Sequence, residues 1–176
     1  MGEAAGPTAL VIMGPSGVGK STTAELIAAR LGWPFAEADE FHPRANIDKM
    51  TSGIALDDAD RAPWLAAIRD WISREAARGV STVLTCSALK HSYRDLLREA
   101  DARVCFVALE ADVELVAARM SHRKGHFMPP SLLASQFADL QPLTADEDGI
   151  TVSVAVPPEE VVHEILTKLG LEPSIA

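Results

Sequence analysis

One stretch near the N-terminus constrains the fold of this sequence more than any other. Residues 9–13 form an apolar run typical of a short buried strand, and residues 14–21 follow as Gly-Pro-Ser-Gly-Val-Gly-Lys-Ser. Apolar residues then recur at helical spacing as far as Leu31, and Gly32 predicts the end of that helix. The chain therefore passes from strand to helix through a glycine-rich loop. Such a loop points backbone N–H groups at an anion, and the helix N-terminus adds a partial positive charge.

Residues 14–21 fit the pattern G-x-x-x-x-G-K-S of a phosphate-binding loop, or P-loop. Lys20 can neutralise the β- and γ-phosphate oxygens of a nucleoside triphosphate, and the Ser21 hydroxyl can ligate Mg²⁺. The alternative is a tight turn whose glycines only relieve strain, but strand, loop, Lys-Ser pair and helix together favour nucleotide binding. We therefore predict ATP and Mg²⁺ as ligands, with Ser21 on the metal. The predicted ATP contacts are Gly14, Pro15, Ser16, Gly17, Val18, Gly19, Lys20, Ser21 and Thr22.

Composition narrows the class of protein. A length of 176 residues predicts a single domain, and a formal net charge of −9 argues against a nucleic-acid-binding protein. An acidic protein that binds an anion must gather its positive charge locally. Cys86 and Cys105 lie in apolar stretches without metal-ligand spacing, which predicts reduced core residues. No apolar run of membrane length and no signal peptide is found, which predicts a cytoplasmic protein without a membrane partner.

Strand-like and helix-like segments alternate along the chain. We expect strands at residues 9–13, 33–38, 82–86, 103–109 and 150–156. Helices are expected after residue 21 and at residues 63–78, 89–100, 112–122, 131–140 and 158–169. This alternation predicts an α/β fold of the P-loop NTPase type, with a five-stranded parallel sheet and helices on both faces. Two polar stretches interrupt the pattern, and we interpret residues 40–61 as a substrate-binding insertion and residues 123–130 as a mobile lid loop.

Three residues outside the P-loop suggest phosphoryl transfer. Asp39 follows the second expected strand, and strand carboxyl ends border the ligand crevice in such sheets. Its carboxylate can accept a hydroxyl proton opposite the γ-phosphate or hold Mg²⁺ through water, although an exposed acid or helix cap is the simpler alternative. Arg119 and Arg123 share one face of the helix that leads into the lid. One can stack on adenine and the other can reach the transferring phosphoryl group, unless both only end a solvated helix.

Four blocks of sequence, of which the P-loop is the first, carry a resemblance to a known family. They are Gly-Pro-Ser-Gly-Val-Gly-Lys-Ser, Asp39-Glu-Phe-His-Pro with Asp58-Ala-Asp-Arg-Ala-Pro-Trp, Cys86-Ser-Ala-Leu-Lys with Tyr93-Arg-Asp, and His126-Phe-Met with Ser135-Gln-Phe. The chain resembles the gluconokinases, small P-loop kinases related to shikimate and adenylate kinases. The resemblance implies transfer of the ATP γ-phosphate to the 6-hydroxyl of D-gluconate, giving 6-phosphogluconate and ADP, and it suggests a homodimer. Glu37 departs from the family, which often has Asp there.

The expected reaction assigns roles to individual residues. Lys20, Asp39 and Arg123 are the predicted catalytic residues, and Arg119 is a predicted ATP contact. Gluconate carries a carboxylate and five hydroxyls, so its site needs a cation and several small polar groups. The predicted substrate contacts are His42, Arg44, Lys49, Arg61, Arg94, His126 and Gln136. Each of these is an ordinary surface residue in the simpler interpretation, and His42 before Pro43 can instead fix a turn.

Other residues are assigned from their place along the chain. Trp64, Trp71, Phe137 and Met50 are expected in the core. Residues 156–158, just before the last helix, are expected to form a wall beside the adenine.

Two rival functions remain open at this stage. A shikimate kinase would predict a glycine triplet after the third strand, where this chain has Cys86-Ser-Ala-Leu. A nucleotide-dependent switch would hydrolyse ATP slowly and respond to a protein partner rather than to a sugar acid. A nucleoside monophosphate kinase does not account for the His-Pro and Asp-Arg-Ala-Pro-Trp segments.

Overall fold

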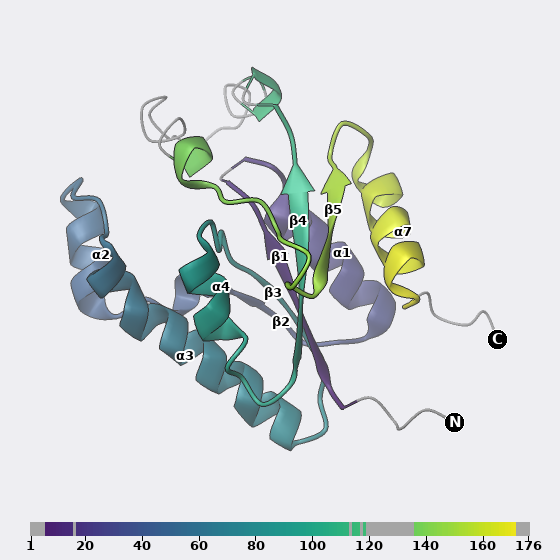
Figure 1. The fold of residues 1–176 in the computed structure, drawn as a ribbon, viewed down its shortest axis with the longest axis horizontal. Helices are drawn as coiled ribbons and strands as arrows, with labels where there is room; N and C mark the ends of the chain where they lie inside the picture. The colour runs from purple at the N-terminus through teal and green to yellow at the C-terminus, as the bar shows by residue number, and fades with distance from the viewer. Residues whose placement is uncertain (1–5, 16, 113, 117, 119–135, 172–176) are drawn as a thin grey trace.

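The computed structural model describes residues 6–171 except 16, 113, 117 and 119–135 (Figure 1). Its strands are β1 (Thr8–Met13), β2 (Phe35–Glu37), β3 (Thr82–Thr85), β4 (Arg103–Glu110) and β5 (Gly149–Ser153). Its helices are α1 (Lys20–Leu31), the 3₁₀ helix η1 (Ala38–Phe41), α2 (Arg44–Thr51), α3 (Asp58–Ala77), α4 (His91–Leu97) and α7 (Pro158–Leu169). Residues 114–116 and 136–139 are also helical, but most of the two helices predicted around the lid, and the lid itself, lie outside the described residues.

The five strands form one parallel sheet in the order β2-β3-β1-β4-β5. The predicted five-stranded parallel sheet is therefore confirmed. All six residues of β1 are buried, which explains why this strand reads as an unbroken apolar run. Because the strands are parallel, the segments that follow β2, β3 and β1 leave the sheet side by side at one edge.

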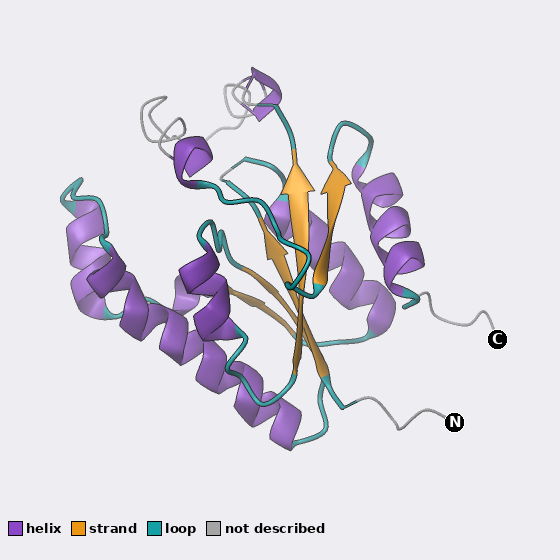
Figure 2. Ribbon diagram, in the orientation of Figure 1, coloured by secondary structure: helices purple, strands orange, loops and turns teal. Residues whose placement is uncertain are grey.

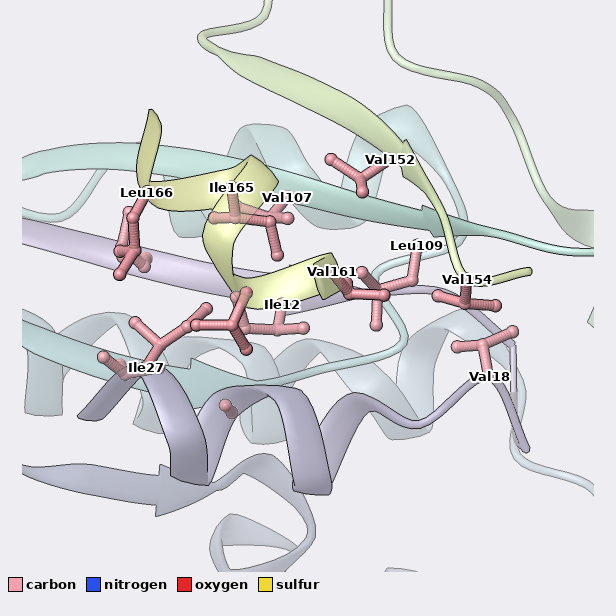
Figure 3. Close-up of a cluster of buried hydrophobic side chains, with 14 of the residues drawn as sticks. Ile12, Val18, Ile27, Val107, Leu109, Val152, Val154, Val161, Ile165 and Leu166 are labelled. Carbon is pink, nitrogen blue, oxygen red and sulfur yellow. The ribbon is translucent and has the colours of Figure 1, made fainter. Parts of the chain in front are cut away.

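Helices cover both faces of the sheet (Figure 2). Alternate residues of β1 serve the two faces, with Leu10 and Ile12 on one side and Val11 and Met13 on the other. The first face packs against α1 and α7, where residues such as Ile27 and Ile165 meet the strands (Figure 3). The second face packs against α3 and α4. Its core includes Trp64, Ile68, Tyr93, Leu97 and Phe106.

Helix ends follow local capping signals. Helix α7 runs from Pro158 to Leu169 as predicted, with proline in its first turn and Gly170 at φ 68° after its end. Helix α3 begins at Asp58 rather than at Pro63. Asp57 and Asp60 there form a reciprocal capping box, which was not predicted.

The polar segment after β2 differs most from expectation. It contains helix α2, which was not predicted. Met50 on this helix is 45% exposed, so its prediction as a core residue is wrong, whereas Trp64 is buried as expected. Cys86 and Cys105 are buried free thiols, in agreement with the sequence analysis. Among the described residues, no helix is both long and apolar enough to cross a bilayer.

Candidate active site

The P-loop adopts a conformation that requires its glycines. Gly14, Gly17 and Gly19 have φ of 145°, 86° and 93°, values that side chains rarely allow. A Cβ on Gly14 would lie 3.0 Å from Val18 Cγ2 and 3.1 Å from the carbonyl oxygen of Leu109. The Gly14 N–H also donates to the carbonyl oxygen of Ser87, 3.3 Å away, which ties the loop to the segment after β3. The loop is therefore a backbone cradle held between β1, β3 and β4.

Lys20 occupies the centre of this cradle. It is the first residue of α1, and its Nζ donates to the carbonyl oxygens of Gly14 at 2.8 Å and Pro15 at 3.0 Å. Gly19 precedes the helix, and no described side chain caps its first N–H groups, which leaves them available to an anion. Burial lowers the pKa of Lys20 from 10.5 to about 8, although nearby acidic groups raise it in part. The structure thus places an ammonium and helix N–H groups where phosphates would bind.

A cavity of about 490 Å³ opens on the α7 side of the P-loop. It is large enough for a nucleoside, and its walls are mainly backbone and apolar side chains. Residues 156–158, which are predicted to form a wall beside the adenine, lie at this cavity together with the P-loop. Its lining comprises Gly17, Val18, Gly19, Thr22, Thr23, residues 154–158 and Val161.

Asp39 lies on the opposite side of the P-loop from this cavity. It belongs to η1, directly after β2, and its side chain is 92% exposed. Asp39 and Glu37 both raise the pKa of Lys20, so the three charged groups share one site. Glu37 is tied to β3, because the Thr85 hydroxyl donates to its Oε2 at 2.6 Å. Asp39 is therefore the better placed of the two acids to meet a bound ligand.

A cluster of charged and aromatic side chains borders Asp39. Arg61 Nη1 donates to the Tyr93 hydroxyl at 2.6 Å, and that hydroxyl donates to Asp58 Oδ1 at 2.6 Å. Lys90 Nζ lies 3.4 Å from the same carboxylate oxygen and 5.6 Å from the centre of the Tyr93 ring. Arg61 also acts on the pKa of His42, which itself lies beside Asp39. Arg61 thus stands near the exposed acid Asp39, and Lys90 belongs to the same cluster through Asp58 and Tyr93.

Lys90 and Tyr93 were not among the predicted site residues. Both belong to the segments that carry the resemblance to the gluconokinases, but no role was predicted for them. Their position shortly after β3 could have predicted them as site residues, because the carboxyl end of β3 borders the P-loop.

Arg94 requires a correction. Its side chain is fully buried, and its guanidinium donates to Glu147 Oε2 at 2.5 Å and to Oε1 at 3.1 Å. Its remaining donors reach the carbonyl oxygens of Ala88 and Gln141, both at 2.8 Å, and that of Leu89 at 3.4 Å. A guanidinium so occupied has no donor left for a sugar acid. The predicted substrate contact of Arg94 is therefore replaced by a structural role.

Two of the other predicted substrate contacts, Arg44 and Lys49, form ion pairs with acidic residues of the protein. Arg44 is 86% exposed and pairs with Asp48, and Lys49 pairs with Asp60 at 2.8 Å. Gln136 lies in the helical residues 136–139, which are far along the chain from Asp39 and Arg61. The structure thus gathers Lys20, Asp39, His42 and Arg61. Ser16, Arg119, Arg123 and His126 lie outside the described residues.

The residues near the P-loop fit a magnesium ion bound with a nucleotide. Ser21 stands in the first turn of α1 and is exposed. Hydroxyl and carboxylate oxygens are the donors that Mg²⁺ prefers, and it keeps several waters and phosphate oxygens as ligands. In the part of the chain that the structure describes, no three His, Cys, Asp or Glu side chains gather as a metal site. Ser21 would accordingly hold Mg²⁺ together with the phosphate oxygens of a bound nucleotide.

The sheet order, the P-loop and the flanking acid define a small P-loop kinase. A family model described as an AAA domain matches residues 10–143. The gluconokinase of Gluconobacter oxydans (strain 621H) is 49% identical over 166 residues, which cover 94% of this chain and 93% of that one. The chain therefore belongs to the gluconokinase family.

Solved structures agree with this assignment. The crystal structure of a sugar kinase from Janibacter sp. HTCC2649 superposes with a TM-score of 0.89 at 48% identity, covering 97% of this chain and 98% of that one. A gluconokinase from Sinorhizobium meliloti 1021 gives a TM-score of 0.85 at 45% identity, covering 95% and 94%. Shikimate kinase from Aquifex aeolicus vf5 is only 20% identical with a TM-score of 0.59, which shows a shared fold alone.

Proposed function

We infer that this protein transfers the γ-phosphate of ATP to the 6-hydroxyl of D-gluconate, giving 6-phosphogluconate and ADP. The observation that carries the inference is 49% identity to a gluconokinase over nearly the whole of both chains. The site supports it, because the exposed acid Asp39 and the cations Lys20 and Arg61 gather at the P-loop. An anionic, hydroxylated acceptor needs such a combination.

The nucleotide is proposed to bind with its base in the cavity beside the P-loop and its phosphates over the loop itself. The base would occupy the cavity between the P-loop and residues 154–158. The phosphates would lie over the loop, where the α1 N-terminus and Lys20 offset their charge. Ser21 would offer its hydroxyl to Mg²⁺, which supplies further charge neutralisation when it is bound with ATP.

The acceptor is proposed to bind on the Asp39 side. Asp39 would orient the 6-hydroxyl and take its proton as the hydroxyl oxygen bonds to the γ-phosphorus. The bond from that phosphorus to the β–γ bridging oxygen breaks, and ADP leaves. Arg61 and Lys90 would attract the gluconate carboxylate. Mutual placement and charge account for most catalysis in reactions of this kind.

Several predicted contacts remain predictions. Arg119 and Arg123 are proposed to contact adenine and the transferring phosphoryl group, His126 and Gln136 to contact the sugar acid, and two copies of the chain to form a homodimer.

An acceptor panel tests the function. ADP release with Mg²⁺ and ATP should depend on D-gluconate, and not on shikimate, AMP or the absence of an acceptor, and the product should be 6-phosphogluconate by mass spectrometry. Activity with shikimate or AMP alone would contradict the inferred substrate. ADP release that needs no acceptor would instead favour a nucleotide-dependent switch.

ATP affinity is expected to fall at alkaline pH. The pKa of Lys20 is lowered to about 8 in the free protein, and bound phosphates favour its charged form, so that its pKa rises on binding. Binding therefore takes up a proton between the two pKa values, and affinity should weaken by up to about tenfold per pH unit above pH 8. Calorimetric Kd values for MgATP at pH 7, 8 and 9 without acceptor measure this. Lys20→Arg, which stays charged, should show a flat profile, and a flat wild-type profile would refute the prediction.

A further inference from the structure

The orientation of one buried amide determines the protonation of a neighbouring histidine. Asn46 is 3% exposed, and its Nδ2 donates to the backbone carbonyl oxygen of Asp60 at 2.9 Å. A carbonyl oxygen can only accept, so this contact fixes which end of the amide is the NH₂ group. The same Nδ2 lies 3.2 Å from His42 Nδ1. His42 Nδ1 must therefore accept this hydrogen bond, and the proton of the neutral ring is on Nε2.

The imidazole is also held rigidly in place. The His42 side chain is 6% exposed and stacks on Trp64, with ring centres 4.3 Å apart and planes at 13°. Trp64 is anchored in turn, because its Nε1 donates to the carbonyl oxygen of Ala38 at 2.7 Å. Burial lowers the pKa of His42, an effect that Asp39 opposes and Arg61 reinforces, which favours the neutral ring. His42 is thus a fixed, uncharged N–H donor.

This donor faces the exposed carboxylate of the proposed base. His42 Nε2 lies 4.0 Å from Asp39 Oδ1, about 1 Å beyond hydrogen-bond distance. Because the Asp39 side chain is open to solvent, rotation of that side chain can close the gap. A hydrogen bond to one carboxylate oxygen would leave the other for the acceptor hydroxyl. A neutral donor also lowers the basicity of a carboxylate less than a cation does.

We propose that His42 is a positioning residue, which uses its Nε2–H to orient the Asp39 carboxylate toward the acceptor hydroxyl, with Asn46 fixing the required tautomer. This role rests on the proposed function, in which Asp39 takes the hydroxyl proton. It differs from the direct substrate contact that the sequence predicted for His42. A substrate contact would act on gluconate binding, whereas a positioning role acts on turnover through Asp39.

Two substitutions at His42 separate the donor from the packing. His42→Phe keeps an aromatic ring against Trp64 and removes the N–H. His42→Gln offers an amide N–H in its place. We expect kcat with gluconate to fall about 10- to 100-fold in His42→Phe, with KM for ATP and gluconate within about twofold of wild type, and partial recovery of kcat in His42→Gln.

A double-mutant cycle with Asp39→Asn supplies the decisive readout. Asp39→Asn alone should lower kcat strongly, and adding His42→Phe should then change kcat by less than about twofold, because the group on which His42 acts is already lost. Thermal unfolding confirms that each variant is folded. If His42→Phe does not fold, the same cycle is run with His42→Ala.

The outcomes distinguish this inference from the function beneath it. Normal kcat in His42→Phe, an equal loss with and without Asp39, or a raised KM for gluconate at normal kcat would overturn the positioning role while leaving gluconate phosphorylation intact. Normal kcat in Asp39→Asn would remove Asp39 as the base and overturn the inference with it. Loss of gluconate dependence in the wild type would instead defeat the proposed function.

Discussion

Replacing Lys20 with alanine is expected to lower kcat for gluconate phosphorylation by about 10³-fold or more, since one preorganised charge facing the transferring group contributes that much in comparable sites. The Lys20 ammonium is held by the carbonyl oxygens of Gly14 and Pro15, so the substitution removes a charge that the loop fixes in place. Steady-state assays of ADP release with saturating MgATP and gluconate measure the effect.

Lys168→Ala is the matched control. Lys168 is half exposed on α7 and pairs with Glu164 one helical turn away, so its removal should leave kcat unchanged and stability within about 0.5 kcal/mol. Thermal unfolding of both variants separates lost chemistry from lost folding. A folded Lys20→Ala protein with more than a tenth of wild-type kcat would contradict the role of Lys20 in phosphoryl transfer.

Replacing Arg94 with methionine is expected to lower the free energy of unfolding by about 3–5 kcal/mol. The substitution leaves Glu147 as a buried carboxylate without its partner, and it frees the carbonyl oxygens of Ala88 and Gln141. Burial alone would raise the pKa of Glu147, but hydrogen bonds from Arg94 and the Thr144 N–H outweigh it and hold the pKa below its ordinary value. Urea denaturation at pH 7 measures the loss.

A neighbouring ion pair provides the control for this prediction. Arg103 pairs with Asp148 at 2.7 Å, but both side chains are about half exposed. Arg103→Met should therefore cost no more than about 1 kcal/mol. Similar losses in the two variants would show that burial does not set the contribution of Arg94. A stable Arg94→Met protein with raised KM for gluconate would restore the substrate contact predicted from sequence.

The parts of the fold that were predictable are those encoded locally. The P-loop requires glycines at fixed positions, and α7 carries its proline start and glycine end within its own sequence. Helix α2 lacked such a signal. Its Ile47 and Met50 are exposed, so the helix has no buried stripe to produce a periodic pattern. Apolar periodicity reports packing on the core, and a helix that stands away from the core escapes it.

In the candidate site, too, locally encoded features were predictable and those that depend on distant residues were not. The position of Asp39 at the edge of the P-loop site was predictable, because this residue comes directly after a parallel strand. The different environments of Lys90 and Arg94, which lie close together in the sequence, were not predictable. Arg94 is buried because its partner is Glu147, on a segment far along the chain, whereas Lys90 pairs with Asp58 at the surface. Local sequence carries no information on which cation meets a distant carboxylate.

The strand order has a consequence for how specificity can change. β1 is the central strand of the sheet. The cavity proposed for the base lies on the side of β5 and α7. Asp39, Arg61 and Lys90 lie on the other side, where they follow β2 or border β3. The P-loop is the part that the two halves share. Under the proposed function, substitutions in residues 38–61 and 87–93 are therefore expected to alter the choice of acceptor and to leave nucleotide binding intact. With the two proposed sites on opposite sides of the P-loop, donor preference and acceptor preference are expected to change independently of each other.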